Sequence, residues 1–177
     1  ITCKKLKDTL QNLKMLWFII EKLQLLKRNN MNISNEGISL IKKFEGLELE
    51  SYQCSAGVWT IGYGETKDIR EGMTITIEQA DNMLLNSLDI FCLHVEKAVE
   101  VDLKQCEFDA LVSWTYNLGP TNLNESTMLV EINNKNWDEV PHQMKRWNKA
   151  NGKVLEGLVR RREAEALLFQ GKDWTEV

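Results

Sequence analysis

Three side chains suited to acid–base chemistry lie close together in this sequence. Glu45 is followed by a glycine, and Cys54 and Thr60 come nine and fifteen residues later. A partly buried carboxyl group can stay protonated near neutral pH and donate its proton to a leaving oxygen. A threonine hydroxyl can hold a water molecule, and a thiolate is a good nucleophile or base. Hydrolysis of a glycosidic bond needs such a proton donor together with a placed or activated water.

Position alone does not assign Glu45 to catalysis, because a glutamate at a helix end is commonly a solvated surface residue. The apolar residues Ile38, Ile41 and Phe44 share one helical face, and Gly46 then predicts a helix that ends at Glu45. From residue 52 to residue 64, strand-forming residues alternate with glycines, which predicts one or two hairpins in a small sheet reaching about Thr74. A hairpin there would return Cys54 and Thr60 toward the helix end.

Helices are predicted for the rest of the chain. A capping-box signature at residues 76–79 starts a helix over about 77–99. Residues 103–117 are apolar on most sides, which is typical of a central helix, and Gly119-Pro120 stops it. Further helices are expected from Ser126 or Thr127 to Asn133, over 137–149 up to the break at Asn151-Gly152, and over 158–169. The order predicts an α+β fold with a sheet lobe at about 46–75, a helical lobe at about 76–171, and a cleft for a polymer between them.

Charge and cysteine content exclude several classes of function. The net charge is −4, and residues 1–30 hold seven basic and two acidic side chains, so the remainder is strongly acidic. No basic stripe lies along that body, and we therefore expect no nucleic-acid partner. The four cysteines form no Cys-x-x-Cys pair and lie far apart, which argues against a zinc site and against a disulfide framework. We expect most of them to be small buried hydrophobic residues.

Residues 4–28 read as one amphipathic helix with a basic face, and the asparagines that follow place a boundary near residue 30. The segment is expected to form a basic N-terminal extension that precedes a domain at 31–177. One interpretation is peripheral contact with an anionic envelope surface, and the other is packing against the body or an appendage without a partner. No stretch reaches the roughly 18 uninterrupted apolar residues of a spanning helix.

Several separated motifs between residues 31 and 170 closely resemble the phage-type lysozymes, the endolysins of glycoside hydrolase family 24. They occur in the order found in that family, and Met31-Asn32-Ile33 resembles a family amino terminus. The matching segments are Phe44–Gly46, Tyr52, Gly57–Gly64, Phe108–Val112, Tyr116–Gly119, Arg146-Trp147 and Gly157–Glu165.

The resemblance implies a lysozyme-like fold and an endolysin that hydrolyses the β-1,4 bond between N-acetylmuramic acid and N-acetylglucosamine in peptidoglycan, causing lysis. It implies that Glu45 is the general acid and that Cys54 and Thr60 position or activate the water. By the same analogy, residues Tyr63, Asn117 and Thr127 bind substrate. No metal or organic cofactor is implied.

Two positions depart from the family pattern. Cys54 stands where aspartate is commoner, and no partner cysteine follows Glu45 closely, so we expect a constitutively free thiol. Glu65 stands where the family usually has histidine after Gly-Tyr-Gly. The salt bridge of that histidine would be lost, and we expect a less stable small lobe but retained catalysis.

Two sets of large side chains have alternative interpretations. Arg160, Arg161 and Arg162 could touch an acidic glycan, but an ion-paired helix face with Glu156, Glu163 and Glu165 is favoured. Trp114, Trp137, Trp147 and Trp174 could stack on sugars, although tryptophan in a helix is more often a core residue.

The leading functional hypothesis is a monomeric muramidase whose partner is the glycan strand. It would be made in the bacterial host cytoplasm and act on the periplasmic cell wall. The alternatives are a non-catalytic peptidoglycan-binding module on the same fold and a related chitin- or chitosan-cleaving enzyme. Retention of Glu45 and Thr60 favours the enzyme over the binding module.

Overall fold

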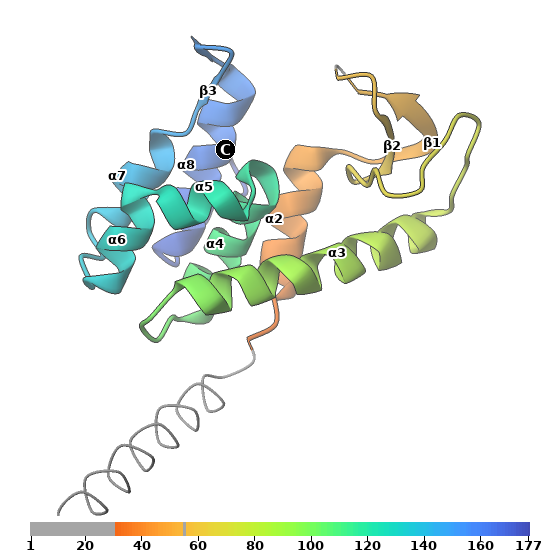
Figure 1. Ribbon diagram of the computed structural model, residues 1–177. Coiled ribbons are helices and arrows are strands. Elements are labelled where there is room, and N and C mark those ends of the chain that lie inside the picture. Colours follow the sequence, from red (N-terminus) through yellow and green to blue (C-terminus); the bar gives the residue numbers. More distant parts are fainter. Residues whose placement is uncertain (1–30, 55) are drawn as a thin grey trace, which may run out of the picture. The chain divides into compact units, whose positions relative to one another are not determined.

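The computed structural model describes residues 31–54 and 56–177. A short helix and a small sheet come first along the chain, and the remaining helices follow (Figure 1). The predicted helix over residues 4–28 and the proposed extension at 1–30 lie outside the described residues. Within the described part, no helix is both long enough and apolar enough to cross a membrane.

Helix α2 (Asn35–Glu45) carries the carboxylate at its last residue. The hydroxyl of Ser34 accepts a hydrogen bond from the backbone N–H of Glu36 and so caps the start of the helix. Leu40 and Ile41 are completely buried on the inner face. Gly46 adopts φ 75°, which L-residues with a side chain rarely do, and this conformation ends the helix directly after Glu45.

The sheet lobe is one antiparallel hairpin of β1 (Glu48–Gln53) and β2 (Trp59–Gly62). Its register pairs Tyr52 with Thr60, and an isolated bridge joins Glu50 to Thr74. The predicted small sheet reaching Thr74 is therefore confirmed. The hairpin and the long turn after it lie between α2 and α3 along the chain, and β2 contacts α3 (Figure 1).

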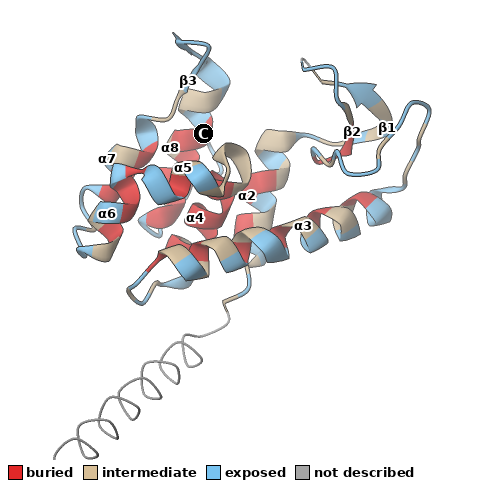
Figure 2. Ribbon diagram, in the orientation of Figure 1, coloured by how far each residue is buried: buried red, intermediate tan, exposed pale blue. Residues whose placement is uncertain are grey.

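Two helices organise the core of the helical lobe. Helix α3 (Ile77–Ala98) begins with the predicted capping box of Thr76 and Gln79, and it contacts both β2 and the helical lobe. Helix α4 (Gln105–Leu118) is the central helix, and its Phe108, Leu111 and Trp114 side chains are almost completely buried. Figure 2 shows buried residues along α4 and on the inner faces of its neighbours. Gly119 ends α4 as predicted.

The last third of the chain differs from the prediction in two places. Pro120 stops α4 but also begins α5 (Pro120–Glu125), because proline suits the first turn of a helix. The helix predicted over 137–149 is only α7 (Val140–Lys145), and a small hairpin follows it. The remaining elements are α6 (Thr127–Asn133), β3 (Lys149–Ala150), β4 (Lys153–Val154) and α8 (Glu156–Phe169).

The small hairpin has a local cause in its turn residues. Asn151 and Gly152 both have positive φ, at 51° and 75°, which is the conformation of a two-residue hairpin turn. The Asn151-Gly152 pair thus forms a hairpin turn, which is more than the helix break that the sequence predicts there.

The four helical-lobe tryptophans named above lie in the core or pack against it. Trp114 packs edge-on against Trp147 with ring centroids 5.2 Å apart. Trp174 is buried, and its indole N–H donates to Glu36 at 2.8 Å. Trp137 packs near Phe169 at the far end of α8. The core interpretation of these side chains is the one the structure supports.

Candidate active site

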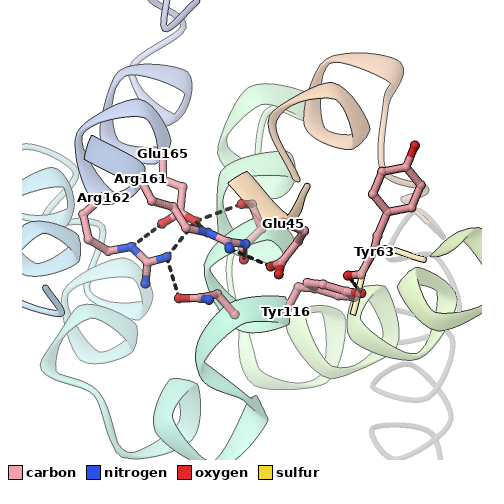
Figure 3. A network of polar contacts seen from close by, with 8 residues as sticks. Glu45, Tyr63, Tyr116, Arg161, Arg162 and Glu165 are labelled. Carbon is pink, nitrogen blue, oxygen red and sulfur yellow. Dashed lines mark hydrogen bonds and ion pairs between the residues drawn. The ribbon is translucent and has the colours of Figure 1, made fainter. Parts of the chain in front are cut away.

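Glu45 lies in contact with a buried arginine from the other end of the chain. The Nη1 atom of Arg161, on α8, donates to the Oε1 atom of Glu45 at 2.6 Å (Figure 3). The Glu45 side chain is 20% exposed and the Arg161 side chain only 4%. One carboxylate oxygen is thus fixed by the protein interior, while the side chain keeps access to solvent.

Arg161 is itself held by acceptors from two helices. Its Nε atom lies 3.2 Å from Glu165 Oε1, and its Nη2 donates to the carbonyl of Ser113 at 3.4 Å. Glu165 is completely buried and also accepts from the hydroxyl of Ser113 at 2.8 Å and pairs with Arg162. Burial raises the pKa of the Glu165 carboxyl, and the charges of Arg162 and Arg161 oppose that rise.

The ion-paired interpretation of the arginine run is therefore confirmed at Glu165, with which both Arg161 and Arg162 pair. Arg161 and Arg162 are buried, and they pair with Glu45 and Glu165. Lys145, and none of the three arginines, pairs with Glu163. Helix α8 packs extensively against α4. The guanidinium groups of Arg161 and Arg162 therefore lie inside the protein, between the helices.

A cleft of about 400 Å³ opens beside Glu45, between the turn after β2 and the helical lobe. Tyr63 and Asn117, two of the predicted substrate-binding residues, line it. The side chain of Asn117 accepts from Arg162 at 3.0 Å, and the hydroxyl of Tyr63 donates to Asp81 at 3.1 Å. The other lining residues are Gly64, Glu65, Thr66, Lys67, Ser87, Ile90, Phe91 and Tyr116.

Thr127, the third predicted substrate-binding residue, is not among the residues that line this cleft. It is the first residue of α6 and is exposed. Its assignment to substrate binding stays a prediction.

Gly64 leaves space directly in front of Glu45. A Cβ atom at this position would lie 3.8 Å from Glu45 Oε2 and 3.9 Å from the hydroxyl of Tyr116. Gly64 also has φ 110°, where a side chain would be strained. The oxygen of Glu45 that Arg161 does not hold therefore faces a part of the cleft that the chain keeps open.

Cys54 and Thr60 are brought together by the hairpin. The backbone N–H of Cys54 donates to the carbonyl of Val58 at 3.0 Å, and the Thr60 hydroxyl donates to the same carbonyl at 3.0 Å. The pKa of the Cys54 thiol is lowered, first by the backbone N–H of Ala56 and also by the backbone N–H of Val58. These contacts favour the thiolate, as a reactive or hydrogen-bond-accepting cysteine requires.

Cys54 and Thr60 are not among the residues that line the cleft beside Glu45. Burial raises the pKa of Tyr52, and the charges of Glu48, Cys54 and Glu45 raise it further. The thiol and the carboxylate therefore lie within electrostatic range of the same phenol. Cys54 forms no disulfide with another cysteine of the described residues, and its being a constitutively free thiol stays a prediction.

The described residues were compared with the requirements of a metal site and of a disulfide. No group of three or more histidine, cysteine, aspartate or glutamate side chains is placed to hold a metal ion there. Cys92 is buried and Cys106 is half-buried, and both are free. The prediction of small buried cysteines fits Cys92 best.

Three residues of the site were missed from the sequence. The sequence places Arg161 and Tyr116 in motifs that resemble the family and Glu65 at a departure from the family pattern, but it assigns none of the three a role in the site. Arg161 lies 116 residues from Glu45 in the sequence, so no local spacing connects them. The only sequence signal for Arg161 is its place in a run of arginines within a helical segment. Arginine is rarely buried unless it is paired, so a buried member of this run would need a carboxylate partner.

Comparisons with known proteins find similarity to phage lysozymes and endolysins. The phage lysozyme family model matches residues 42–165. The endolysin of Acyrthosiphon pisum secondary endosymbiont phage 1 is 40% identical over 79% of this chain and 99% of its own length. The endolysin of Bacillus phage B103 is 42% identical over 78% of this chain, and the chain spans only 54% of that relative.

A solved structure extends the similarity to the fold. The muramidase domain of SpmX from Asticaccaulis excentricus is 39% identical, with a TM-score of 0.74. The match covers 78% of this chain and 97% of that one. The two-lobed α+β arrangement expected from the sequence is therefore confirmed.

Proposed function

Since the chain belongs to the phage lysozyme family, we propose that it cleaves the β-1,4 bond between N-acetylmuramic acid and N-acetylglucosamine in bacterial peptidoglycan. Family membership makes the chain a lysozyme-type glycoside hydrolase and a peptidoglycan-lytic protein. The proposal adds the bond that is cut, the residues that cut it, and the place where the enzyme acts.

The observation that carries the proposal is the asymmetric environment of Glu45. Arg161 holds Oε1 at 2.6 Å, while Oε2 faces the open space in front of Gly64. A general acid needs one oxygen free to carry the proton to the glycosidic oxygen of the leaving sugar. Arg161 orients the carboxyl group for that transfer, and it stabilises the carboxylate that remains after the proton has left.

Cys54 and Thr60 act on the attacking water in this proposal. The single hydrogen of the Thr60 hydroxyl is directed to the carbonyl of Val58, so its oxygen is free to accept a hydrogen bond from water. The thiolate of Cys54, which backbone N–H groups favour, accepts the second hydrogen of that water and becomes a thiol when it takes up the proton. Together they place the water and draw its proton as the new bond to the sugar forms.

The glycan strand is proposed to bind along the cleft beside Glu45. Tyr63 and Asn117 line that cleft and are each fixed by a charged partner, Asp81 and Arg162. Thr127 is proposed to contact the strand beyond the cleft. Fixed polar groups of this kind lose little conformational entropy when they bind a sugar.

The cellular setting is proposed from the relatives, whose names describe endolysins. The protein would be made in the host cytoplasm and act as a monomer on the periplasmic wall. Residues 1–30, which lie outside the described part, would contact the anionic envelope through their basic side chains.

Analysis of the new reducing ends tests the proposal directly. Purified peptidoglycan is digested, reduced with borohydride and hydrolysed, and the reduced amino sugar is identified. Reduced muramic acid at the new ends is the expected product. Reduced glucosamine would show that the other glycosidic bond is cut, and an absence of new reducing ends with retained binding would identify a non-catalytic wall-binding module.

A further inference from the structure

Tyr63 lines the cleft but has little surface to offer a ligand. Only 6% of the residue is exposed, and its hydroxyl donates to Asp81 on α3 at 3.1 Å. A phenol has one hydrogen to donate, so Tyr63 can offer a sugar only acceptor oxygens while this contact is made. Figure 3 shows the ring of Tyr63 leading away from Glu45, with its backbone beside Tyr116. The contacts of Tyr63 with the protein are therefore its main contribution to the site.

Asp81 joins Tyr63 to Lys42 of α2. The Lys42 ammonium group lies 2.7 Å from Asp81 Oδ1, the same oxygen that accepts from Tyr63. It also lies over the Tyr63 ring, 5.2 Å from the centroid. The hydrogen bond from Lys42 lowers the pKa of the Asp81 carboxyl, and the hydrogen bond from Tyr63 lowers it further, against a small effect of burial. These three side chains, Lys42, Tyr63 and a charged Asp81, form one unit that we call the anchor cluster.

The anchor cluster connects the helix that carries Glu45 with the cleft wall in front of it. Lys42 lies three residues before Glu45, so both belong to the last turn of α2. Gly64 follows Tyr63 directly, and a Cβ atom at Gly64 would lie 3.8 Å from Glu45 Oε2. A displacement of Tyr63 therefore displaces the wall next to the oxygen that is proposed to carry the proton.

The backbone of Tyr63 is fixed as well. Its carbonyl accepts from the hydroxyl of Tyr116 on α4 at 3.1 Å, and its N–H donates to Glu65 at 2.9 Å. Tyr63 is thus a point at which side chains from α2, α3 and α4 all hold the turn after β2. The contact with Asp81 is the one that a substitution can remove without touching the cleft, because Asp81 is not among the residues that line it.

We propose that Asp81 is a positioning residue, which together with Lys42 anchors Tyr63 and so sets the position of the turn after β2 relative to Glu45. Asp81 acts on the reaction through Tyr63 and has no contact with the substrate. The proposal rests on the proposed hydrolysis of peptidoglycan and on the role of Glu45 as its general acid.

The exposure of the ion pair separates positioning from support of the fold. The side chains of Lys42 and Asp81 are 31% and 37% exposed, and ion pairs exposed to this degree contribute little to stability. Asp81→Ala should therefore lower the unfolding midpoint by less than about 4 °C. Reaction geometry is more sensitive, because a misplacement of about 1 Å can slow catalysis by about 100-fold.

A double-mutant cycle in the full chain tests the proposal, with the variants Asp81→Ala, Tyr63→Phe and the two combined. Alanine removes the anchor, and phenylalanine keeps the ring but removes the hydroxyl that Asp81 holds. Asp81→Asn is the conservative replacement, since its amide oxygen can still accept from Tyr63. Two exposed carboxylates give matched controls, Asp89→Ala on the same helix and Glu71→Gln in the sheet lobe.

The constants kcat and KM are measured with soluble, uncross-linked peptidoglycan strands at a temperature where all variants are folded. We expect kcat to fall at least about fivefold in Asp81→Ala and in Tyr63→Phe, with KM changed less than about twofold. The combined variant should stay within about twofold of the slower single variant, since both changes break one contact. Asp81→Asn should be at least about twofold faster than Asp81→Ala, and both controls should match the wild type.

Three kinetic results would overturn the proposal. An unchanged kcat in Asp81→Ala would show that the anchor does not affect the reaction. Losses that multiply in the combined variant would show that Asp81 and Tyr63 act independently. A change in KM alone would show that the Tyr63 phenol binds the sugar directly and that Asp81 only supports that contact.

The amide resonance of Gly64 gives a readout that needs no substrate. The Gly64 N–H donates to the carbonyl of Ile61 at 3.2 Å within the turn, so its chemical shift reports the geometry of the turn. We expect Asp81→Ala to move this resonance and Asp89→Ala to leave it in place. An unmoved resonance in Asp81→Ala would overturn the anchoring even if Glu45 proves to be the general acid. A wild type that clears no peptidoglycan would instead refute the proposed hydrolysis, and the Gly64 resonance would still decide whether Asp81 anchors the turn.

Discussion

Replacing Arg161 by lysine keeps the positive charge but removes the planar guanidinium group that contacts Glu45. The guanidinium group meets Glu45 of α2 at 2.6 Å, Glu165 of its own helix at 3.2 Å and the carbonyl of Ser113 on α4 at 3.4 Å. A lysine amine is a compact donor on a flexible stem and cannot reach three acceptors that lie on three elements. At least one of the three acceptors loses its partner.

The magnitude follows from the burial of these groups. The Arg161 side chain is 4% exposed, and Glu165 is completely buried, so water does not replace a lost contact there. A hydrogen bond to a charged group contributes about 1.5–3 kcal/mol, and leaving its partner buried has a similar cost. We therefore expect Arg161→Lys to lower the free energy of unfolding by about 2–4 kcal/mol. For a domain of this size, that corresponds to a fall in the unfolding midpoint of roughly 4–15 °C.

Urea and thermal unfolding followed by circular dichroism measure this change, with Arg160→Lys as the matched control. Arg160 is the preceding residue on α8 and is exposed, so its replacement should stay within about 0.5 kcal/mol of the wild type. Arg161→Lys should also clear peptidoglycan more slowly at a temperature where it is fully folded, because Glu45 is no longer oriented. An Arg161→Lys protein as stable as Arg160→Lys would refute the supporting role of this network.

Two further predictions concern the ends of the sheet lobe. Thr76→Ala removes the side-chain cap at the start of α3 and should cost about 1 kcal/mol, measured by urea unfolding; an unchanged midpoint would show that the capping box contributes nothing. Iodoacetamide should modify Cys54 at least about tenfold faster than the buried Cys92 at pH 7, as peptide mapping can measure, because backbone N–H groups favour the Cys54 thiolate while burial raises the pKa of Cys92. Half-maximal reactivity of Cys54 should lie below pH 9.0, the ordinary thiol value, and equal rates at the two cysteines would contradict the assignment.

Much of the fold was predictable because its signals are local. The glycine after Glu45, the capping box at residues 76–79 and the apolar character of α4 each act within a few residues of the element they define. The family resemblance was likewise carried by contiguous motifs, and the match of the phage lysozyme family model to residues 42–165 confirms it. The expected lysozyme-type glycoside hydrolase is confirmed with it.

The parts that were not predictable depend on contacts between distant segments. Nothing near Arg161 in the sequence indicates that α8 buries its charge against Glu45 and Ser113. Nor is the inward fold of the Glu65 side chain predictable, since it depends on the space above Gly62 and on the backbone N–H of Tyr63, from which Glu65 Oε2 accepts a hydrogen bond. The roles of the three predicted catalytic residues stay predictions, although the hairpin does bring Cys54 and Thr60 into contact.

The most direct measurement compares clearing of purified peptidoglycan by wild type, Glu45→Gln and the control Glu71→Gln, with binding to the same peptidoglycan measured by cosedimentation. Glutamine nearly preserves the shape of the side chain and removes the proton donor. We expect Glu45→Gln to lose at least about 100-fold in clearing rate while it still binds, and Glu71→Gln to match the wild type. A Glu45→Gln protein that clears peptidoglycan at the wild-type rate would contradict the assignment of Glu45 as the general acid.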